Sequence, residues 1–241
     1  MKGVGFKFDS RHSYNDFGLV LDSKQIADPQ KSKIKISVPY MNGTYDFSTI
    51  GSGGEQVFGE RDVQVILGMP TGSKEELQIV YSQILEWLKD TGRQQLIFDD
   101  MYTYYFEAEV ETVSKFEEMY RMGKITIMFT AQPFRHSIDY MGDDIWDDFC
   151  FLTDYTQYSN VFDITEDGPG NTVIMYNNGR PVVPEIDVDV DGMRLNFKSK
   201  TYYLIKGSNK FYDLKLENGE NIFHFYNAIG KVKIIFRCEV L

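Results

Sequence analysis

The apolar residues of this chain recur at every second position over most of its length, and with a helical period in one stretch only. Between Ser73 and Leu88 they fall on a single helical stripe, formed by Leu77, Tyr81, Ile84, Leu85 and Leu88. Ser73 and Glu76 have the spacing of a capping box at the helix start. Gly92 is placed to end the helix in the left-handed conformation. One amphipathic helix cannot fold alone, so we expect this stripe to pack on a sheet.

The first half of the chain otherwise predicts strands and turns. Ile34, Ile36 and Val38 alternate with polar residues, as on a half-buried strand. Asn42-Gly43 follows, which is the dipeptide most typical of a hairpin turn. The segment from Thr49 to Glu55 is a loop rich in Gly and Ser. We expect a β-sandwich-like domain with one α-helix over residues 1–138.

The second half predicts an antiparallel β-sandwich, because short strands alternate with turns rich in Gly and Asn. The expected strands are Val173–Tyr176, Ile186–Val190, Leu195–Phe197, Thr201–Ile205, Phe211–Leu216, Ile222–Tyr226 and Val232–Phe236. The acidic, aromatic segment Tyr140–Tyr158 precedes them and is typical of a connector. It is either a solvated turn or a docking surface for a partner. We therefore expect a mainly β chain whose second domain, residues 139–241, includes this connector.

Composition limits the partners that the chain can have. It contains 36 Asp and Glu against 25 Lys and Arg, a formal net charge of −11. This balance opposes binding to phosphate backbones but suits a surface that nucleic acid must pass without sticking. Two Cys in 241 residues argue against a disulfide scaffold. The first residues carry no apolar signal segment and no stretch has the length of a membrane span. We expect folding in a cytoplasm and no membrane partner.

No group of residues forms a recognisable active site. Asp187, Asp189 and Asp191 open like a calcium loop, but Lys198 stands where a bidentate Glu is needed. On a strand the three carboxylates would instead line the solvent face. The three His residues are far apart in sequence, and none has a second ligand at metal spacing. We predict that the protein is not an enzyme and has no catalytic residues, no metal site and no cofactor.

Several short stretches occur in an order that points to a family. In the first half they are Phe17-Gly18-Leu19, Val38-Pro39-Tyr40-Met41-Asn42-Gly43-Thr44-Tyr45-Asp46-Phe47-Ser48, Trp87-Leu88 and Pro133-Phe134. In the second half they are Asn177-Asn178-Gly179, Pro184-Glu185-Ile186 and Leu216-Glu217-Asn218-Gly219. The chain resembles, from end to end, the distal tail proteins (Dit) of siphophages and prophages of Gram-positive bacteria. It departs from them at Tyr40, where the family often has Gly, and in its short connector, which leaves no room for an inserted carbohydrate-binding module.

The resemblance implies a hexameric ring in the virion, at the tail tip or baseplate. The N-terminal domain would form the ring and continue the tail tube, and genomic DNA would pass through without specific binding. The C-terminal domain would be galectin-like and hold tail-tip, receptor-binding or baseplate proteins. The alternative function is that of a carbohydrate-binding module that contacts the host cell wall. Against this alternative, sugar sites usually use an exposed Trp, and no Trp follows the connector.

A closed ring needs a heterologous interface, in which one face of each copy matches a different face of the next. Edge strands and extended loops suit this purpose, because their unpaired backbone groups can complete a sheet across copies. We expect the interface within Tyr40–Glu60, and the candidate residues are Tyr40, Met41, Asn42, Gly43, Gly51, Gly53 and Phe58. Gly53→Pro, or deletion of Ser48–Glu55, should then leave a folded monomer that fails to form rings.

Overall fold

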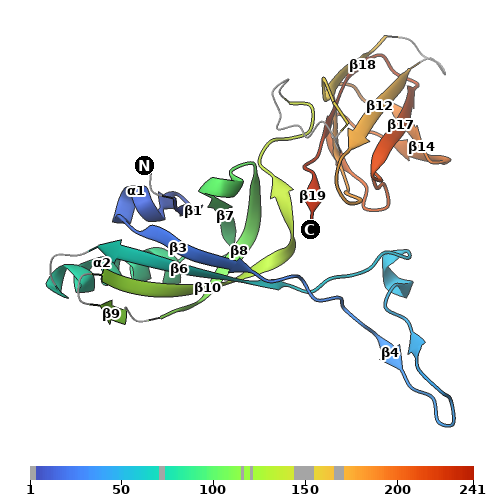
Figure 1. The fold of residues 1–241 in the computed structure, drawn as a ribbon. Helices are drawn as coiled ribbons and strands as arrows, with labels where there is room; N and C mark the ends of the chain where they lie inside the picture. Colours follow the sequence, from blue (N-terminus) through green and yellow to red (C-terminus); the bar gives the residue numbers. More distant parts are fainter. Residues whose placement is uncertain (1–3, 71–73, 115–116, 120–121, 144–154, 166–170) are drawn as a thin grey trace. The chain divides into compact units, whose positions relative to one another are not determined.

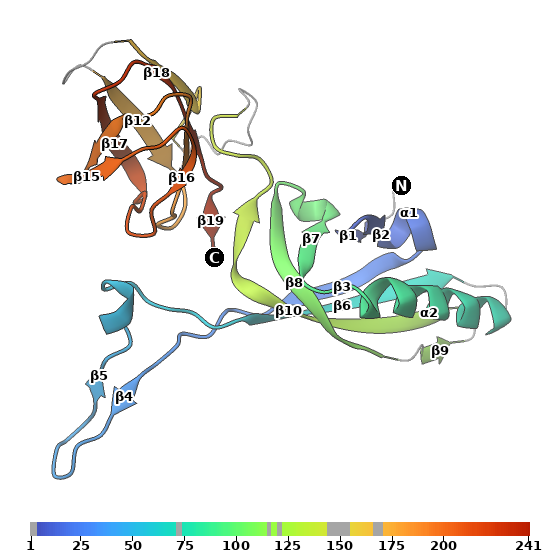
Figure 2. The same ribbon diagram turned by 180° about the vertical axis from the view of Figure 1, so that it is seen from behind.

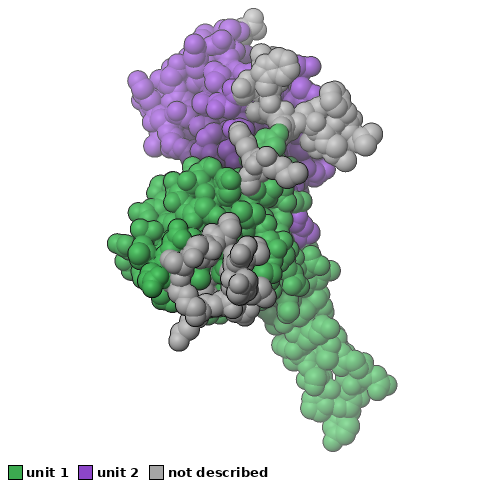
Figure 3. Space-filling model, turned by 60° about the vertical axis from the view of Figure 1, so that its left-hand side comes forward, with its two compact units in different colours: residues 1–135 green, residues 136–241 purple. Residues whose placement is uncertain are grey.

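The computed structural model describes residues 4–70, 74–114, 117–119, 122–143, 155–165 and 171–241. The chain divides into two compact units, residues 1–135 (unit 1) and 136–241 (unit 2), which Figure 3 colours separately. Two features expected from the sequence lie outside the described residues, namely the capping role of Ser73 and positions 144–154 of the connector. The described residues form mainly β structure, which confirms the expected fold class.

Unit 1 is a curled antiparallel sheet with one long helix along one face (Figures 1 and 2). Its elements are β1 (Phe6–Phe8), β2 (Arg11–His12), α1 (Ser13–Phe17), β3 (Val20–Ile26), β4 (Lys35–Ile36), β5 (Tyr45–Asp46), the 3-10 turn η1 (Ile50–Ser52), β6 (Arg61–Pro70), α2 (Lys74–Lys89), β7 (Gln94–Phe98), the 3-10 turn η2 (Asp99–Met101), β8 (Tyr104–Val113), β9 (Glu117–Met119) and β10 (Met122–Ser137), whose last residues belong to unit 2. The strand order is β2-β1-β7-β8-β10-β6-β3, with β9 paired to β10, while β4 and β5 pair apart from this sheet.

The core of unit 1 lies between the sheet and α2. Alternate residues of β6 and β10 are fully buried, as on strands with one covered face: Val63, Val65, Leu67, Ile125, Ile127 and Phe129. The helix contributes Leu77, Ile84, Trp87 and Leu88 to the same cluster. The predicted packing of the α2 stripe on a sheet is therefore confirmed.

Trp87 fixes the position of α2. Its ring stacks with those of Phe6 and Phe17, at centroid distances of 5.8 and 4.9 Å. Its indole N–H donates to the carbonyl oxygen of Phe8 at 3.1 Å, which satisfies a polar group that burial would otherwise leave unpaired. The helix is thus joined to β1 by both packing and a hydrogen bond.

The C-terminus of α2 differs from the prediction. Gly92 does not adopt the left-handed conformation. The hydroxyl of Thr91 instead donates to the carbonyl oxygen of Trp87. A side chain therefore satisfies a carbonyl at the helix end, where a left-handed glycine would have brought a backbone N–H.

The five-residue helix α1 is an element that the sequence pattern did not predict. Its N-cap is His12, whose Nδ1 accepts the N–H groups of Tyr14 and Asn15 at 3.1 and 3.2 Å. The other ring nitrogen of His12, Nε2, lies 3.0 Å from Oδ1 of Asp99. Gly18 ends the helix in the left-handed conformation. His12 therefore acts as a structural link between α1 and the end of β7.

Unit 2 is a sandwich of two antiparallel sheets. Its elements are β11 (Val161–Ile164), β12 (Thr172–Asn177), β13 (Glu185–Val188), β14 (Arg194–Phe197), β15 (Lys200–Tyr203), β16 (Gly207–Lys210), β17 (Gly219–Tyr226), β18 (Gly230–Ile235) and β19 (Glu239–Val240). The sheet orders are β11-β18-β13-β16 and β12-β17-β14-β15. Side chains of both sheets form one buried cluster, which includes Val188, Val232 and Ile234 from the first sheet and Met175, Leu195 and Phe225 from the second. The expected antiparallel sandwich is confirmed.

One strand of unit 2 was predicted in the wrong place. Phe211–Leu216 is not a strand but contains a turn, closed by a hydrogen bond from Leu214 N–H to Phe211 O of 3.0 Å. The strand is β16, over residues whose Gly-Ser-Asn sequence suggests a turn. It is held by the buried amide of Asn209, which accepts from Ile205 N–H at 3.0 Å and donates to the carbonyl oxygens of Ile205 and Gly207. A satisfied buried amide thus stabilises a polar edge strand.

Candidate assembly surfaces

The chain between β3 and β6, residues 27–60, forms a feature that we call the arm. Figures 1 and 2 show it as a long hairpin that leaves the sheet at the end of β3 and returns at the start of β6. At its root Lys31 and Phe58 form an isolated antiparallel bridge, and farther out β4 pairs with β5. Every residue from 31 to 40 is exposed, and Ser48 is the one buried residue between 31 and 57. The arm therefore has almost no core of its own.

The outer part of the arm has one apolar face and one polar face. Ile36 lies opposite Tyr45 in the β4–β5 register, and Phe47 N–H donates to the carbonyl oxygen of Ile34 at 2.8 Å. Since side chains alternate along paired strands, one face carries Ile34, Ile36, Tyr45 and Phe47. The other face carries Lys33, Lys35 and Asp46, with Lys33 Nζ 3.3 Å from Asp46 Oδ2. The exposed fractions on the apolar face are 56% for Ile34, 50% for Ile36 and 53% for Tyr45.

Tyr40 lies at the tip of the arm in a strained conformation. Its φ is 64°, in the left-handed region that glycine adopts without cost, and its side chain is fully exposed. The left-handed conformation costs a residue with a Cβ about 1–2 kcal/mol. Such strain in a fully exposed aromatic residue points to a role outside the isolated chain.

Ser48 organises the return strand of the arm. Its Oγ accepts the N–H of Ile34 at 2.9 Å, and its hydroxyl donates to the carboxylate of Asp46. The Ser48 N–H also donates to Asp46 Oδ1, at 2.9 Å. These two donors from Ser48, with a smaller contribution from Lys33, lower the pKa of Asp46 from 3.8 to about 2. The arm thus has defined local order although its surface is exposed.

The structure brings all seven candidate interface residues onto the arm. Tyr40, Met41, Asn42 and Gly43 form its tip, where Gly43 has a φ of 91°. Gly51 lies in η1, and Gly53 ends that turn with a φ of 73°. Phe58 lies at the root, where its ring meets that of Phe134 edge-on at a centroid distance of 5.6 Å. Their contact with another copy stays a prediction.

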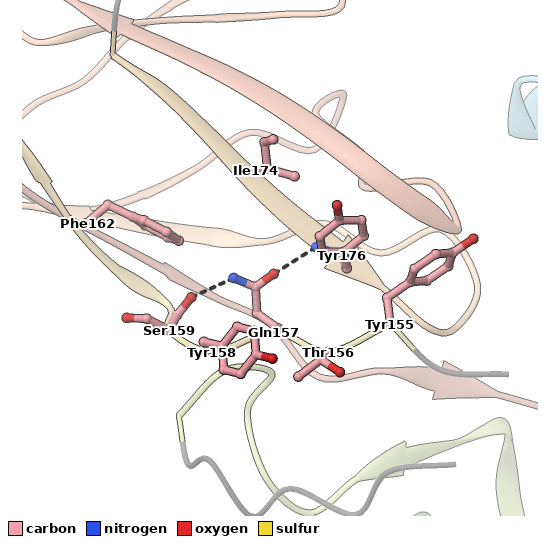
Figure 4. A pocket seen from close by; sticks show the side chains of 8 residues that line it. All are labelled: Tyr155, Thr156, Gln157, Tyr158, Ser159, Phe162, Ile174 and Tyr176. Carbon is pink, nitrogen blue, oxygen red and sulfur yellow. Dashed lines mark hydrogen bonds between the residues drawn. The ribbon is translucent and has the colours of Figure 1, made fainter. Parts of the chain in front are cut away.

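Unit 2 contains a shallow groove of about 550 Å³, shown in Figure 4. It is lined by Tyr155, Thr156, Gln157, Tyr158, Ser159, Phe162, Ile174 and Tyr176. The Gln157 amide accepts from Tyr176 N–H at 3.1 Å and donates to Ser159 O at 2.7 Å. The ring of Tyr155 stacks on that of Tyr176 at 5.1 Å, whereas Tyr158 is 77% exposed. The sequence analysis missed this groove, because its residues come from the end of the connector and from two strands.

Two of the Asp residues that resemble a calcium loop accept hydrogen bonds from the backbone at two different places in the chain. Asp189 Oδ1 accepts the N–H of Lys231 at 2.7 Å, and Asp191 Oδ1 accepts the N–H of Lys206 at 2.8 Å. Within the described residues, no three His, Cys, Asp or Glu side chains are grouped as metal ligands. None of the helices in that part of the chain combines the length and apolarity needed to span a membrane.

Comparison with known proteins places the arm within a family domain. Residues 12–131 match the family model described as the phage tail protein RIFT-related domain. The chain belongs to this phage tail protein family. The matched residues run from the end of β2 into β10, so the phage tail domain includes α2, the whole arm and every strand from β3 to β9, but not β1.

A solved structure of a phage tail protein shares this fold. The Dit protein of phage SPP1 is 11% identical over 100% of both chains, with a TM-score of 0.68. Two structures of the phage p2 baseplate, with Ca and with Sr, are each 10% identical. They cover 98% and 97% of both chains, with TM-scores of 0.42 and 0.38. The TM-score of 0.68 shows that this chain and the SPP1 protein share a fold, whereas the two lower scores do not establish one. No curated protein matches the sequence.

Proposed function

We propose that this chain is a structural hub of a phage tail tip, and that copies of it join through their arms into a closed hexameric ring. The family supports a tail component, and the fold is that of SPP1 Dit, which is described as a paradigm of the hub adsorption apparatus in phages infecting Gram-positive bacteria. The observation that carries the proposal is the uncovered apolar face of the arm, Ile34, Ile36, Tyr45 and Phe47.

The arm needs a partner for physical reasons. A two-stranded hairpin is marginally stable by itself, and β4 and β5 have two residues each. Apolar side chains that stay half exposed gain free energy when another surface covers them. If the partner is a second copy of the chain, every subunit of the ring gains this free energy from covering its arm. Each arm would lie on a different surface of the next copy, which is the heterologous contact that a ring requires.

The remaining roles follow from this ring. Residues 1–138 would form it and meet the tail tube protein, whereas the galectin-like domain, residues 139–241, would hold tail-associated, receptor-binding or baseplate proteins. The net charge of −11 would let DNA pass without binding to the lumen. The role is structural and not catalytic.

Two pairs of substitutions on opposite faces of the same hairpin test the proposal. Ile34→Ser with Ile36→Ser removes apolar surface from the exposed face, and Lys33→Ser with Lys35→Ser changes the polar face to a similar extent. Multi-angle light scattering of the full chain should show rings for the wild type and for the lysine variant, and monomers for the isoleucine variant. Equal masses for the two variants would contradict a role for the apolar face.

Carbohydrate binding is the second candidate, favoured by the tyrosine-lined groove of unit 2. Exposed Tyr158 beside the Gln157 amide offers a ring face and polar groups at one place, as sugar sites do. Sedimentation of the protein with purified host cell wall separates the candidates. Binding that Tyr158→Ala abolishes would favour a carbohydrate-binding module, whereas ring formation without wall binding supports the assembly hub.

A further inference from the structure

Arg61 is a buried cation at the root of the arm. It is the first residue of β6 and is 5% exposed, on the same face as the core residues Val63 and Val65. Its guanidinium carbon lies 5.5 Å from the ring centroid of Phe106. Its Nε is buried and has no hydrogen-bond partner. Arginine is rarely this buried unless it is paired.

Arg135 repeats the arrangement one strand away. It lies on β10, half-buried, with its guanidinium carbon 5.3 Å from the ring centroid of Tyr104 and with an Nε that is also buried and unpartnered. Tyr104 and Phe106 lie two residues apart on one face of β8, about 7 Å by the rise of a strand. Two guanidiniums therefore lie over two neighbouring rings on the same face of the sheet.

Within the described residues, this pair of cations has no counter-ion at ion-pair distance. Among the described residues, no carboxylate lies within 4.0 Å of either guanidinium, although the chain is strongly acidic. Burial lowers the pKa of Arg61, the more distant carboxylate of Asp28 opposes this shift, and Arg135 adds to it. An uncompensated buried charge destabilises the isolated fold, so its presence calls for an anion from outside the chain.

We propose that Arg61 and Arg135 together bind a carboxylate supplied by a second copy of this chain. The inference rests on the proposed association of copies through the arm and names a polar contact within it. Three observations favour a second copy. Arg61 directly follows the arm, Phe134 beside Arg135 packs on Phe58 of the arm, and each copy carries 36 Asp and Glu. A guanidinium over a ring keeps its planar edge of N–H groups for a carboxylate.

Replacing each arginine by methionine separates this role from a structural one. Arg61→Met and Arg135→Met keep most of the side-chain volume and remove the charge, so the monomer should melt at the same or a higher temperature. Association measured by sedimentation equilibrium should weaken at least about 30-fold, as expected when one member of a buried charge pair is lost. The matched control is Arg194→Met, because the guanidinium carbon of Arg194 also lies over a ring, 5.2 Å from the centroid of Tyr203 in unit 2. This substitution should change neither the melting temperature nor the association.

Four results would contradict the proposed carboxylate contact, and they have different causes. If the methionine variants associate like the wild type while the Ile34→Ser, Ile36→Ser variant is monomeric, the carboxylate contact is wrong and the arm contact stands. If the methionine variants melt at a lower temperature without losing association, the arginines are structural and the proposal is overturned. If the wild type never associates, the ring and the contact both fail. A labelled single-stranded oligonucleotide that binds the wild type and not the variants would make phosphate the ligand and overturn the second copy as its source.

Discussion

The sheet of unit 1 and the arm are built from the same alternating pattern, and they differ in what covers the apolar positions. In β6 the residues Val63, Val65 and Leu67 are completely buried in the core cluster of unit 1. In the arm Ile34 and Ile36 alternate in the same way and stay half exposed. Alternation therefore identifies which side chains need to be covered, but it does not identify the molecule that covers them.

The comparison implies that the two regions respond differently to the loss of apolar side chains. Phe129→Ala removes a ring that packs against Phe6 and Phe8 at 5.7 and 5.3 Å, so it should lower the free energy of unfolding by about 3–5 kcal/mol. Ile36→Ala in the arm should change it by less than about 0.5 kcal/mol, because the side chain is half exposed and lies outside the core. Urea denaturation of the monomeric chain measures both values. A comparable loss in the two variants would show that the arm belongs to the folded core.

A smaller effect is expected at the edge of the sheet, where a cap holds α1. His12→Ala removes the acceptor for the N–H groups of Tyr14 and Asn15 and should cost about 1 kcal/mol. His12→Asn keeps a capping oxygen and should restore most of this loss. Thermal denaturation compares the two variants, and an alanine variant as stable as the asparagine variant would argue against the capping role.

The smallest effect concerns the local order of the arm and its dependence on pH. Because the pKa of Asp46 is lowered from 3.8 to about 2, the ionised carboxylate favours the ordered arm. This contribution is complete above the usual pKa and is lost as the pH falls through about 2. In Ser48→Ala the pKa should return toward 3.8, since the Ser48 hydroxyl is the largest cause of the shift. Carboxyl chemical shifts recorded by NMR during acid titration test this, and equal titration midpoints in both proteins would contradict it.

The sequence predicts the elements whose pattern is local. The stripe from Leu77 to Leu88 marks α2 because its period is helical, and the alternation in the second half predicts a sandwich. The sequence could not place β16, because its polar residues form a strand by pairing with the distant strand β13, where the Asn209 amide also donates to the carbonyl oxygen of Ile186. It could not reveal the pairing of Arg61 with Arg135 either, since 74 positions separate them and the sheet order brings them to one face.

The sequence also placed the candidate interface without its geometry. Turn signals and the resemblance to a family indicate an interface within Tyr40 to Phe58. These residues lie on the arm, and their contact with another copy stays a prediction. The strand expected over Ile34–Val38 is shorter in the structure, where β4 is Lys35–Ile36. When alternating apolar and polar residues are used to predict a strand, the apolar face is assumed to be covered by other residues. In the arm none of the described residues covers that face, so the regular pairing is brief.

Amide hydrogen exchange of the arm, in the monomeric chain and in the assembled ring, tests the central claim most directly. We predict that residues 31–57 exchange rapidly in the monomer and become strongly protected in the ring, whereas the amides of β6 between Val63 and Leu67 are slow in both. An arm that exchanges as fast in the ring as in the monomer would contradict the account.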